Sequence, residues 1–172
     1  MQRDTELQAH DAWDRGDLRT ALALFVTSAA SGSRGCALNL GYFYDEGLGI
    51  PQSKSSALYW YRQACRLGDL SGATNIAILC RERGQHHAMF RWFRKACRAN
   101  GGDDGDAELA VARCLLSGLG AGKSRDRALR HLRRALRSRH VTPASVEQAH
   151  ALHRRLTGTA ARRHPQPIRS RP

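Results

Sequence analysis

The chain has 172 residues, enough for one domain or a short array of stacked units, and 41% of them are apolar, as in folded proteins. Its formal net charge is +13. Its apolar runs are far shorter than the roughly 20 residues that cross a bilayer, and its polar start lacks the apolar core of a secretion signal. These features predict a cytoplasmic protein that does not enter a membrane.

The positive charge is concentrated toward the C-terminus. Residues 1–80 carry seven Lys or Arg and eight Asp or Glu, whereas residues 81–172 carry 21 and seven. From Lys123 onward there are fourteen basic residues and two acidic ones. The C-terminal end should therefore project a positive field. Arginine supplies 25 of the 28 basic residues, and its planar fork suits carboxylate or phosphate partners.

The first predicted unit covers about residues 5–32 and is a partial helical hairpin. The segment from Trp13 to Asp17 is typical of a helix end followed by a tight turn. The helix after it carries Leu22, Phe25 and Ala29 on one face, at spacings of three and four residues.

Three fuller hairpins are predicted at about 33–69, 70–102 and 103–140, because one helical pattern recurs after 36 and then 35 residues. In the first helices the repeated positions are Ala37, Leu40, Gly41 and Tyr44, then Ala73, Ile76, Ala77 and Cys80, then Glu108, Val111, Ala112 and Leu115. In the second helices they are Ala57, Trp60, Tyr61 and Ala64, then Met89, Trp92, Phe93 and Ala96, then Ala128, His131, Leu132 and Ala135. This pattern predicts an all-α solenoid in which small residues let paired helices approach closely.

The connections predict where the helices begin and end. The turns at 47–53 and 118–124 start with Gly-Leu-Gly and finish with a serine that can cap the next helix, whereas the middle hairpin has a turn about four residues shorter. Thr142 and Pro143 predict the start of a capping helix over residues 142–156. Residues 157–172 hold three prolines and four arginines, which predicts a basic disordered tail after a single solenoid domain at 1–156.

Several short motifs suggest chemistry that their context does not support. The turn at 118–124 resembles a phosphate-binding loop, but Ser117 stands where that loop needs glycine, and no strand leads into it. The acids at 103–108 lack the ligand spacing of a calcium loop, and His150 and His153 have no third metal ligand. The five cysteines lack the spacing of a zinc or redox site and are expected to be buried thiols. We therefore expect no metal, no cofactor and no enzyme activity.

The hairpins resemble the Sel-one-like repeats (SLR), which are related to the tetratricopeptide repeats. The first full hairpin matches the family pattern at Cys36, Leu40, Gly41, Tyr44, Gly47, Gly49, Ile50, Ala57, Trp60, Ala64 and Gly68. The third matches it at Ala107, Val111, Ala112, Gly118, Gly120, Ala128 and Ala135. The resemblance covers about residues 10–138. One secreted branch of the family joins each hairpin by a disulfide, but the partner positions for Cys65 and Cys97 hold other residues here.

The resemblance implies a right-handed superhelix whose first helices line a concave groove for a protein or peptide. Carried over by position, the groove residues are Leu38, Asn39, Tyr42, Thr74, Asn75, Ile78, Arg81, Leu109 and Arg113. Asn39 and Asn75 are equivalent. In relatives such an asparagine can bind a peptide backbone; the alternative is that both only satisfy groups of neighbouring helices.

Two functions of different classes follow. The first is a non-enzymatic protein–protein interaction module, either an adaptor or a bacterial immunity-type protein that binds an effector, with an acidic partner steered by the basic end. The alternative is sequence-independent nucleic-acid binding through that end. Its basic surface consists of Arg125, Arg127, Arg130, Arg133, Arg134 and Arg137. All aromatic residues precede Arg94, so this surface has no platform for stacking bases, and we prefer the first function.

Overall fold

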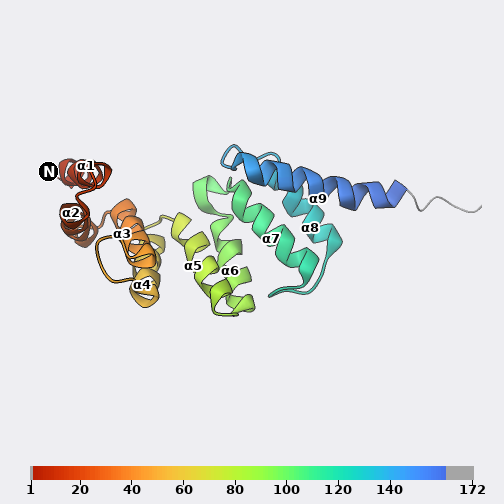
Figure 1. Cartoon of the computed structure of the whole chain (residues 1–172). Helices are drawn as coiled ribbons and strands as arrows, with labels where there is room; N and C mark the ends of the chain where they lie inside the picture. The colour runs from red at the N-terminus through yellow and green to blue at the C-terminus, as the bar shows by residue number, and fades with distance from the viewer. Residues whose placement is uncertain (1, 162–172) are drawn as a thin grey trace, which may run out of the picture.

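The computed structural model describes residues 2–161, and in that part of the chain all regular structure is helical, as the sequence predicts. The helices are α1 (Gln2–Asp14), α2 (Leu18–Ala30), α3 (Arg34–Glu46), α4 (Lys54–Arg66), α5 (Ser71–Glu82), α6 (His86–Ala96), α7 (Gly105–Ser117), α8 (Arg125–Ala135) and α9 (Pro143–Ala161), with a short 3-10 helix at Ala99–Gly101. They form an α-solenoid in which hairpins are stacked along one direction (Figure 1).

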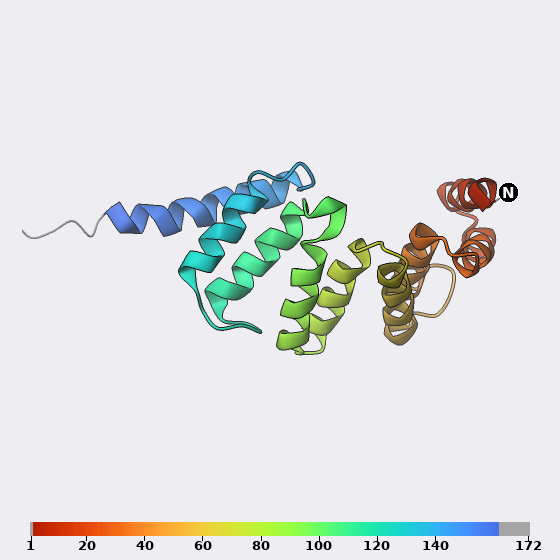
Figure 2. The ribbon, with the colours of Figure 1, turned by 180° about the vertical axis from the view of Figure 1, so that it is seen from behind.

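Each odd-numbered helix up to α7 packs against the even-numbered helix that follows it, and each hairpin packs on the next. The same order is visible from behind in Figure 2, where the array runs from α1 to α9 without a break. The first hairpin, expected to be partial, consists of two helices of 13 residues each, α1 and α2. Four complete hairpins therefore precede α9.

Serine and aspartate side chains cap the N-terminal ends of several helices. Ser53 and Ser124 accept hydrogen bonds from backbone N–H groups in the first turns of α4 and α8, at 3.2 and 3.4 Å. Asp104 does the same for α7 at 2.9 Å. These contacts satisfy donors that a helix start leaves without partners. The two serine caps agree with the sequence prediction, as does the turn of only three residues between α5 and α6.

A glycine sets the distance between the helices of the first full hairpin. A Cβ atom at Gly41 would overlap the ring of Tyr61, which is itself buried. The Tyr61 hydroxyl donates a hydrogen bond to Asp45 Oδ2 at 3.1 Å, and Lys54 Nζ lies 2.6 Å from the other oxygen of that carboxylate. The close approach of α3 and α4 therefore also positions a polar network at the start of the seven-residue turn between them.

The buried residues form two clusters. One is built mainly from α1, α2 and α3, and includes Phe25, Leu40 and Phe43. The other extends from α4 to α9 and includes Tyr61 and Leu132. The boundary between the clusters lies at α4, which contributes side chains to both. This arrangement suits a solenoid, in which each unit contacts only its neighbours.

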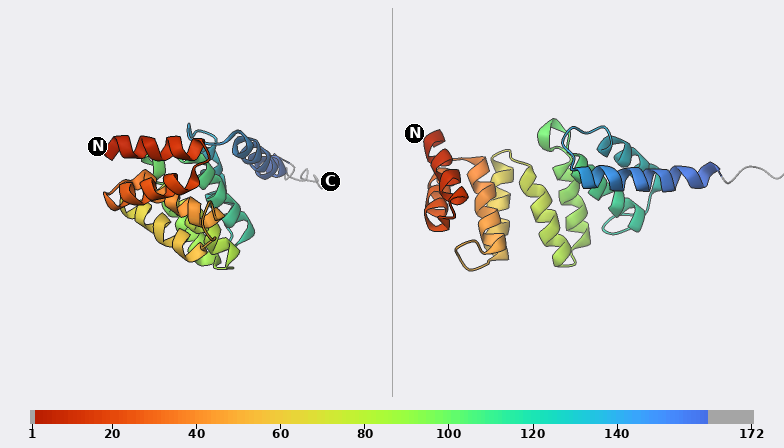
Figure 3. Two further views of the ribbon diagram at one scale, coloured as in Figure 1. Left: turned by 60° about the vertical axis from the view of Figure 1, so that its left-hand side comes forward. Right: turned by 45° about the horizontal axis from the view of Figure 1, so that its top comes forward.

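Helix α9 runs lengthwise along the C-terminal part of the array, packs on α7 and α8 and extends beyond them (Figure 3, right). It continues to Ala161, five residues beyond the predicted end at Leu156. No proline lies between Pro143 and position 165, and the Thr157 hydroxyl donates a hydrogen bond to the carbonyl of His153 at 2.9 Å. Residues 157–161 are therefore helical. The rest of the predicted tail, 162–172, lies outside the described residues.

We expect the stability of this fold to decrease above about pH 9. Burial raises the pKa of the thiols above their ordinary value of 9.0, most of all for Cys97, whose pKa rises to about 12. The other four are Cys36, Cys65, Cys80 and Cys114. Because the unfolded chain loses these protons first, the stabilisation is fully present below pH 9 and is lost as the pH rises through the folded values.

Tyr61 also makes the fold less stable as the pH rises above about 10, because burial, and after it Asp45, raise the pKa of its hydroxyl in the folded chain. The check is the urea midpoint of the wild type and of Tyr61→Phe between about pH 7 and 11. The variant should lose about 1 kcal/mol at neutral pH with its hydrogen bond, but show a smaller decrease above pH 10. A midpoint that stays constant from pH 8 to 11 would contradict this prediction.

Candidate functional site

The residues predicted for the groove lie on three successive odd-numbered helices, α3, α5 and α7. Eight of the nine side chains are at least partly exposed. Those on α3 are Leu38, Asn39 and Tyr42, those on α5 are Thr74, Asn75, Ile78 and Arg81, and α7 supplies Arg113. Figure 3 (left) looks obliquely along the array and shows these helices following one another in depth.

The ninth residue, Leu109, is not part of an open surface. Its side chain is only 4% exposed and belongs to the same core cluster as Ala149 of α9. Helix α9, which contributes Ala149 to this cluster, packs on α7. The sequence prediction for Leu109 as a groove residue is therefore corrected: it holds α7 in the core.

The two equivalent asparagines have different surroundings. The Asn39 side-chain nitrogen lies 3.4 Å from Nε2 of His10 on α1, so this amide is engaged with the preceding hairpin. The Asn75 amide makes no hydrogen bond to another group in residues 2–161 and is partly exposed. The position before the buried Leu or Ile therefore serves contacts between repeats on α3 and leaves a donor and an acceptor accessible on α5.

Arg81 and Arg113 meet at one cavity of the groove. The cavity has a volume of about 220 Å³. Its other lining residues are Met89, Phe93, Ala110, Cys114, Ser117 and Leu119. From α9, Gln148 Oε1 accepts a hydrogen bond from Arg113 Nη1 at 3.4 Å, which restricts that guanidinium. The cavity thus joins an apolar floor to two cationic groups from adjacent repeats, an arrangement that suits an apolar side chain flanked by a carboxylate.

The predicted basic surface on α8 divides into two groups. Arg127, Arg130 and Arg134 of α8 line a cavity of about 410 Å³, together with Arg94 of α6 and Arg98, which follows the end of α6. The other three, Arg125, Arg133 and Arg137, lie outside this cavity, and Arg125 donates a hydrogen bond to the Leu156 carbonyl. Arg94 and Arg98 were not among the residues predicted for this surface, although the repeat register places α6 and α8 as equivalent second helices.

Glu108 lies at this cavity with its carboxylate 6% exposed. One oxygen pairs with Nδ1 of His131, and the other lies 3.8 Å from Nη1 of Arg134. A buried carboxylate is stabilised only when it is paired and hydrogen-bonded. Both partners come from α8, so the interaction fixes α8 on α7 at this point.

The motifs that suggested other chemistry have structural roles. The turn at 118–124 follows a helix, with Gly118 in the left-handed conformation that ends α7. Asp103, Asp104 and Asp106 bind backbone groups near the start of α7 and in the 138–142 segment. In the described part of the chain, no three His, Cys, Asp or Glu side chains gather as metal ligands would, and no helix has the length and apolar character needed to span a membrane.

This chain is similar to a known protein family and to several solved structures. The family model described as Sel1 repeat matches residues 35–69, 90–101 and 105–140. No curated protein matched the chain.

Several solved structures are similar. A Sel1 repeat protein from Oxalobacter formigenes aligns with a TM-score of 0.73 at 23% identity, covering 87% of this chain and 61% of that one. A protective antigen present in uropathogenic Escherichia coli strains, which displays an SLR fold, aligns with a TM-score of 0.67 at 15% identity, covering 100% and 50%. A tetratricopeptide repeat protein from Parabacteroides merdae aligns with a TM-score of 0.61 at 16% identity, covering 93% and 61%.

The chain thus spans 50 to 61% of the length of these structures, and at these identities they show the fold alone. The match to the family model covers both hairpins that have long Gly-Leu-Gly turns, and it omits α5 and the start of α6, where the turn is short. The chain belongs to the Sel1 repeat family, whose helical repeats are related to the tetratricopeptide repeats and form a scaffold for protein–protein interaction.

Proposed function

We propose that this chain is a non-enzymatic binding module that holds an extended, acidic segment of a partner protein in the groove formed by α3, α5 and α7. The observation that carries the proposal is the cavity where Arg81 and Arg113 lie above Met89 and Phe93. An extended peptide presents alternate side chains in opposite directions. One apolar side chain in this cavity would place a neighbouring carboxylate near both guanidinium groups.

Asn75 and Tyr42 offer further partner contacts along the groove beyond the cavity. The accessible Asn75 amide can donate to and accept from a peptide backbone, as the sequence analysis proposed for this position. Tyr42 on α3 is 41% exposed and packs at 6.0 Å against Trp13, with its ring available to a partner. Aromatic and arginine side chains of this kind dominate the binding energy of many interfaces.

An adaptor and an immunity-type protein would both use this groove, and the acidic partner would be a client protein or an effector, respectively. A toxin gene beside this one would favour the immunity role. The five cysteines are all free thiols, which is typical of proteins in a reducing compartment and supports the cytoplasm as the place of action.

Selection of random displayed peptides on the full-length protein tests this proposal. We expect the enriched sequences to combine an acidic residue with an adjacent apolar one, and to bind in a fluorescence anisotropy assay. Replacing Arg81 and Arg113 together with alanine should weaken that binding by about tenfold or more, equal to about 1.4 kcal/mol. Arg83→Ala is the matched control, because Arg83 follows the same helix but does not line the cavity.

Two results would contradict the groove assignment. The first is a set of enriched peptides without acidic residues. The second is a double variant that remains folded, as shown by an unchanged circular dichroism spectrum, and binds the peptide as tightly as Arg83→Ala does.

A further inference from the structure

The even-numbered helices carry a second concentration of positive charge, separate from the groove. Five arginines surround the cavity of about 410 Å³ that Glu108 and His131 also line. On α8, Arg127, Arg130 and Arg134 follow one another at spacings of three and four residues, so they share one helical face over about 10 Å. Arg94 of α6 and Arg98, two residues beyond the end of that helix, also line the cavity.

The third full repeat differs from the first two in the residue pair that lies at this cavity. At the positions of Glu108 and His131, the first repeat has Ala37 and Trp60, and the second has Ala73 and Trp92. Both tryptophans pack against the core clusters. An imidazole is much smaller than an indole, so the third repeat has space where its neighbours have an aromatic side chain. Packing of the solenoid does not require a buried carboxylate at the Glu108 position, because the first two repeats pack with alanine there.

The charges at the cavity are not balanced by the protein itself. The Glu108 carboxylate is occupied by His131 and Arg134. In residues 2–161, no carboxylate forms an ion pair with Arg94, Arg98, Arg127 or Arg130. Guanidinium groups this close repel one another, and that repulsion is relieved when an anion binds between them.

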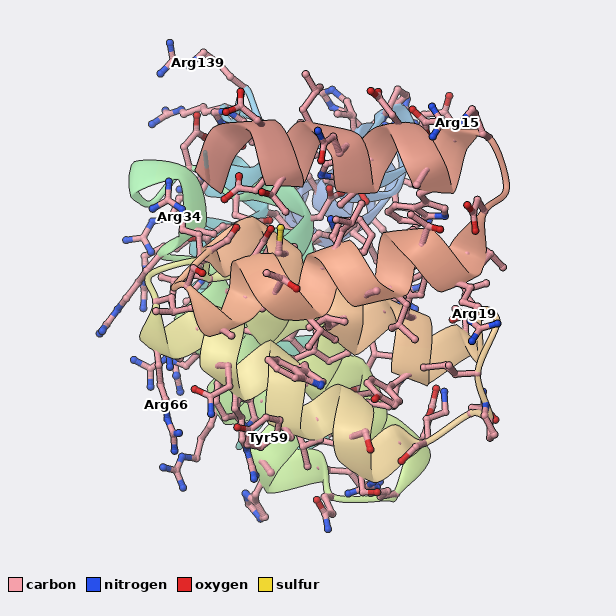
Figure 4. The ribbon with its side chains drawn as sticks, turned by 90° about the vertical axis from the view of Figure 1, so that its left-hand side faces the viewer. Arg15, Arg19, Arg34, Tyr59, Arg66 and Arg139 are labelled. Atoms are coloured by element: carbon pink, nitrogen blue, oxygen red, sulfur yellow. The ribbon has the colours of Figure 1, made fainter. Side chains whose placement is uncertain are left out.

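Nearby positive groups enlarge the field on the same side of the molecule. Arg98 also lines a neighbouring cavity with Arg34, Gly68 and Ser71, at the segments that connect one hairpin to the next. Figure 4, viewed from the α1 end, shows Arg34, Arg66 and Arg139 along one edge of the molecule, whereas Arg15 and Arg19 lie at the opposite edge. Asp69 also lines this neighbouring cavity and Asp103 pairs with Arg139, so these carboxylates offset part of the positive field at that edge.

We propose that the arginine cavity binds a small, multiply charged phosphate anion, such as inorganic triphosphate or the phosphate chain of a nucleotide. Arginine forks match phosphate oxygens with paired hydrogen bonds, and five of them around one cavity require several negative charges rather than one. The Glu108 carboxylate holds His131 and Arg134 in position at the floor. A nucleic acid fits less well, because no Phe, Tyr or Trp side chain lines the cavity to stack on bases.

Isothermal titration of the full-length protein with inorganic tripolyphosphate tests this proposal, with sodium chloride of equal ionic strength in the reference cell. We expect saturable binding to one site and a rise of several degrees in the melting temperature. Arg94→Ala and Arg130→Ala should each weaken binding about tenfold. Arg133→Ala should leave binding within about twofold of the wild type, because it removes the same charge from α8 outside the cavity.

A double variant tests whether the cavity depends on Glu108 and His131. Glu108→Ala combined with His131→Trp restores the residue pair of the first two repeats. We expect it to remain folded, with a melting temperature near that of the wild type, and to lose tripolyphosphate binding because the indole fills the space. If this variant unfolds, Arg94→Ala and Arg130→Ala still decide the question.

Three results would overturn the proposal. One is the absence of saturable binding at millimolar tripolyphosphate. Another is an equal loss of affinity in Arg130→Ala and Arg133→Ala, which would indicate a diffuse field instead of a site. The third is tight binding of single-stranded RNA that tripolyphosphate does not displace, which would assign the arginines to nucleic-acid binding.

Discussion

Replacing Phe25 with alanine is expected to lower the free energy of unfolding by about 3–5 kcal/mol. Phe25 on α2 is fully buried, and its ring makes edge contacts with Trp13, Phe43 and His10 at centroid distances of 5.9, 5.5 and 5.2 Å. Truncation removes all three contacts and leaves a cavity between α1, α2 and α3. The loss of contacts with two neighbouring helices at once is why we expect a large effect.

The effect should also be local. Phe25 belongs to the cluster at the N-terminal end, whereas α5 to α8 are held by the other cluster. In a solenoid, stability is approximately a sum over units and their interfaces. Hydrogen exchange should therefore become faster in α1 to α3 of the variant, with less change in α5 to α8.

Leu132→Ala is the counterpart in the other cluster, with an expected loss of about 2–5 kcal/mol that accelerates exchange in α7 to α9. Uniform acceleration over the whole chain in both variants would show that the array unfolds as a single cooperative unit, against this prediction.

Gly120→Ala is expected to cost about 2–4 kcal/mol, through two effects that add. Gly120 has φ of +76°, a conformation that alanine adopts only with strain. Its added Cβ would also overlap the backbone carbonyl of His86 and approach Cβ of Phe90 at 3.0 Å. Because the obstacle includes the backbone of α6, the turn between α7 and α8 would have to move away from the preceding hairpin.

The same turn provides the control. A Cβ at Gly122 would meet no atom within 4 Å, so Gly122→Ala should change the melting temperature by less than a quarter of the change in Gly120→Ala. Thermal unfolding followed by circular dichroism measures both. Equal melting temperatures for the two variants would show that the turn adapts without cost.

Parts of the candidate site could be predicted from repeat register alone. Position along a helix fixes which side chains share its face, so register places Arg81 and Arg113 on the same face of successive first helices, and both side chains are exposed. Register could not predict that they share one cavity with Met89 and Phe93. That depends on the distance between stacked hairpins, which the spacing of residues along a helix does not encode.

Repeat register also could not predict which arginines line the cavity of about 410 Å³. The predicted arginines are dense in the sequence, whereas Arg94 and Arg98 lie about 30 residues earlier, at the end of α6 and just beyond it, in a segment that the charge count does not single out. The Glu108–His131 pair was visible in the repeat alignment as two departures from the pattern of the first two repeats. Only packing of α8 on α7 shows that these departures meet.

By itself, the sequence determined the helical hairpins, their period of 35 to 36 residues, the serine caps and the lengths of the turns. All of these depend on interactions within a few residues or on one helical face. Tertiary structure decided the rest: that Leu109 of α7 is buried, that His10 engages Asn39 while Asn75 stays partly exposed, and that Arg94 and Arg98 line one cavity with arginines of α8. These outcomes depend on how neighbouring repeats rotate and approach, because long-range packing joins residues that local patterns treat separately.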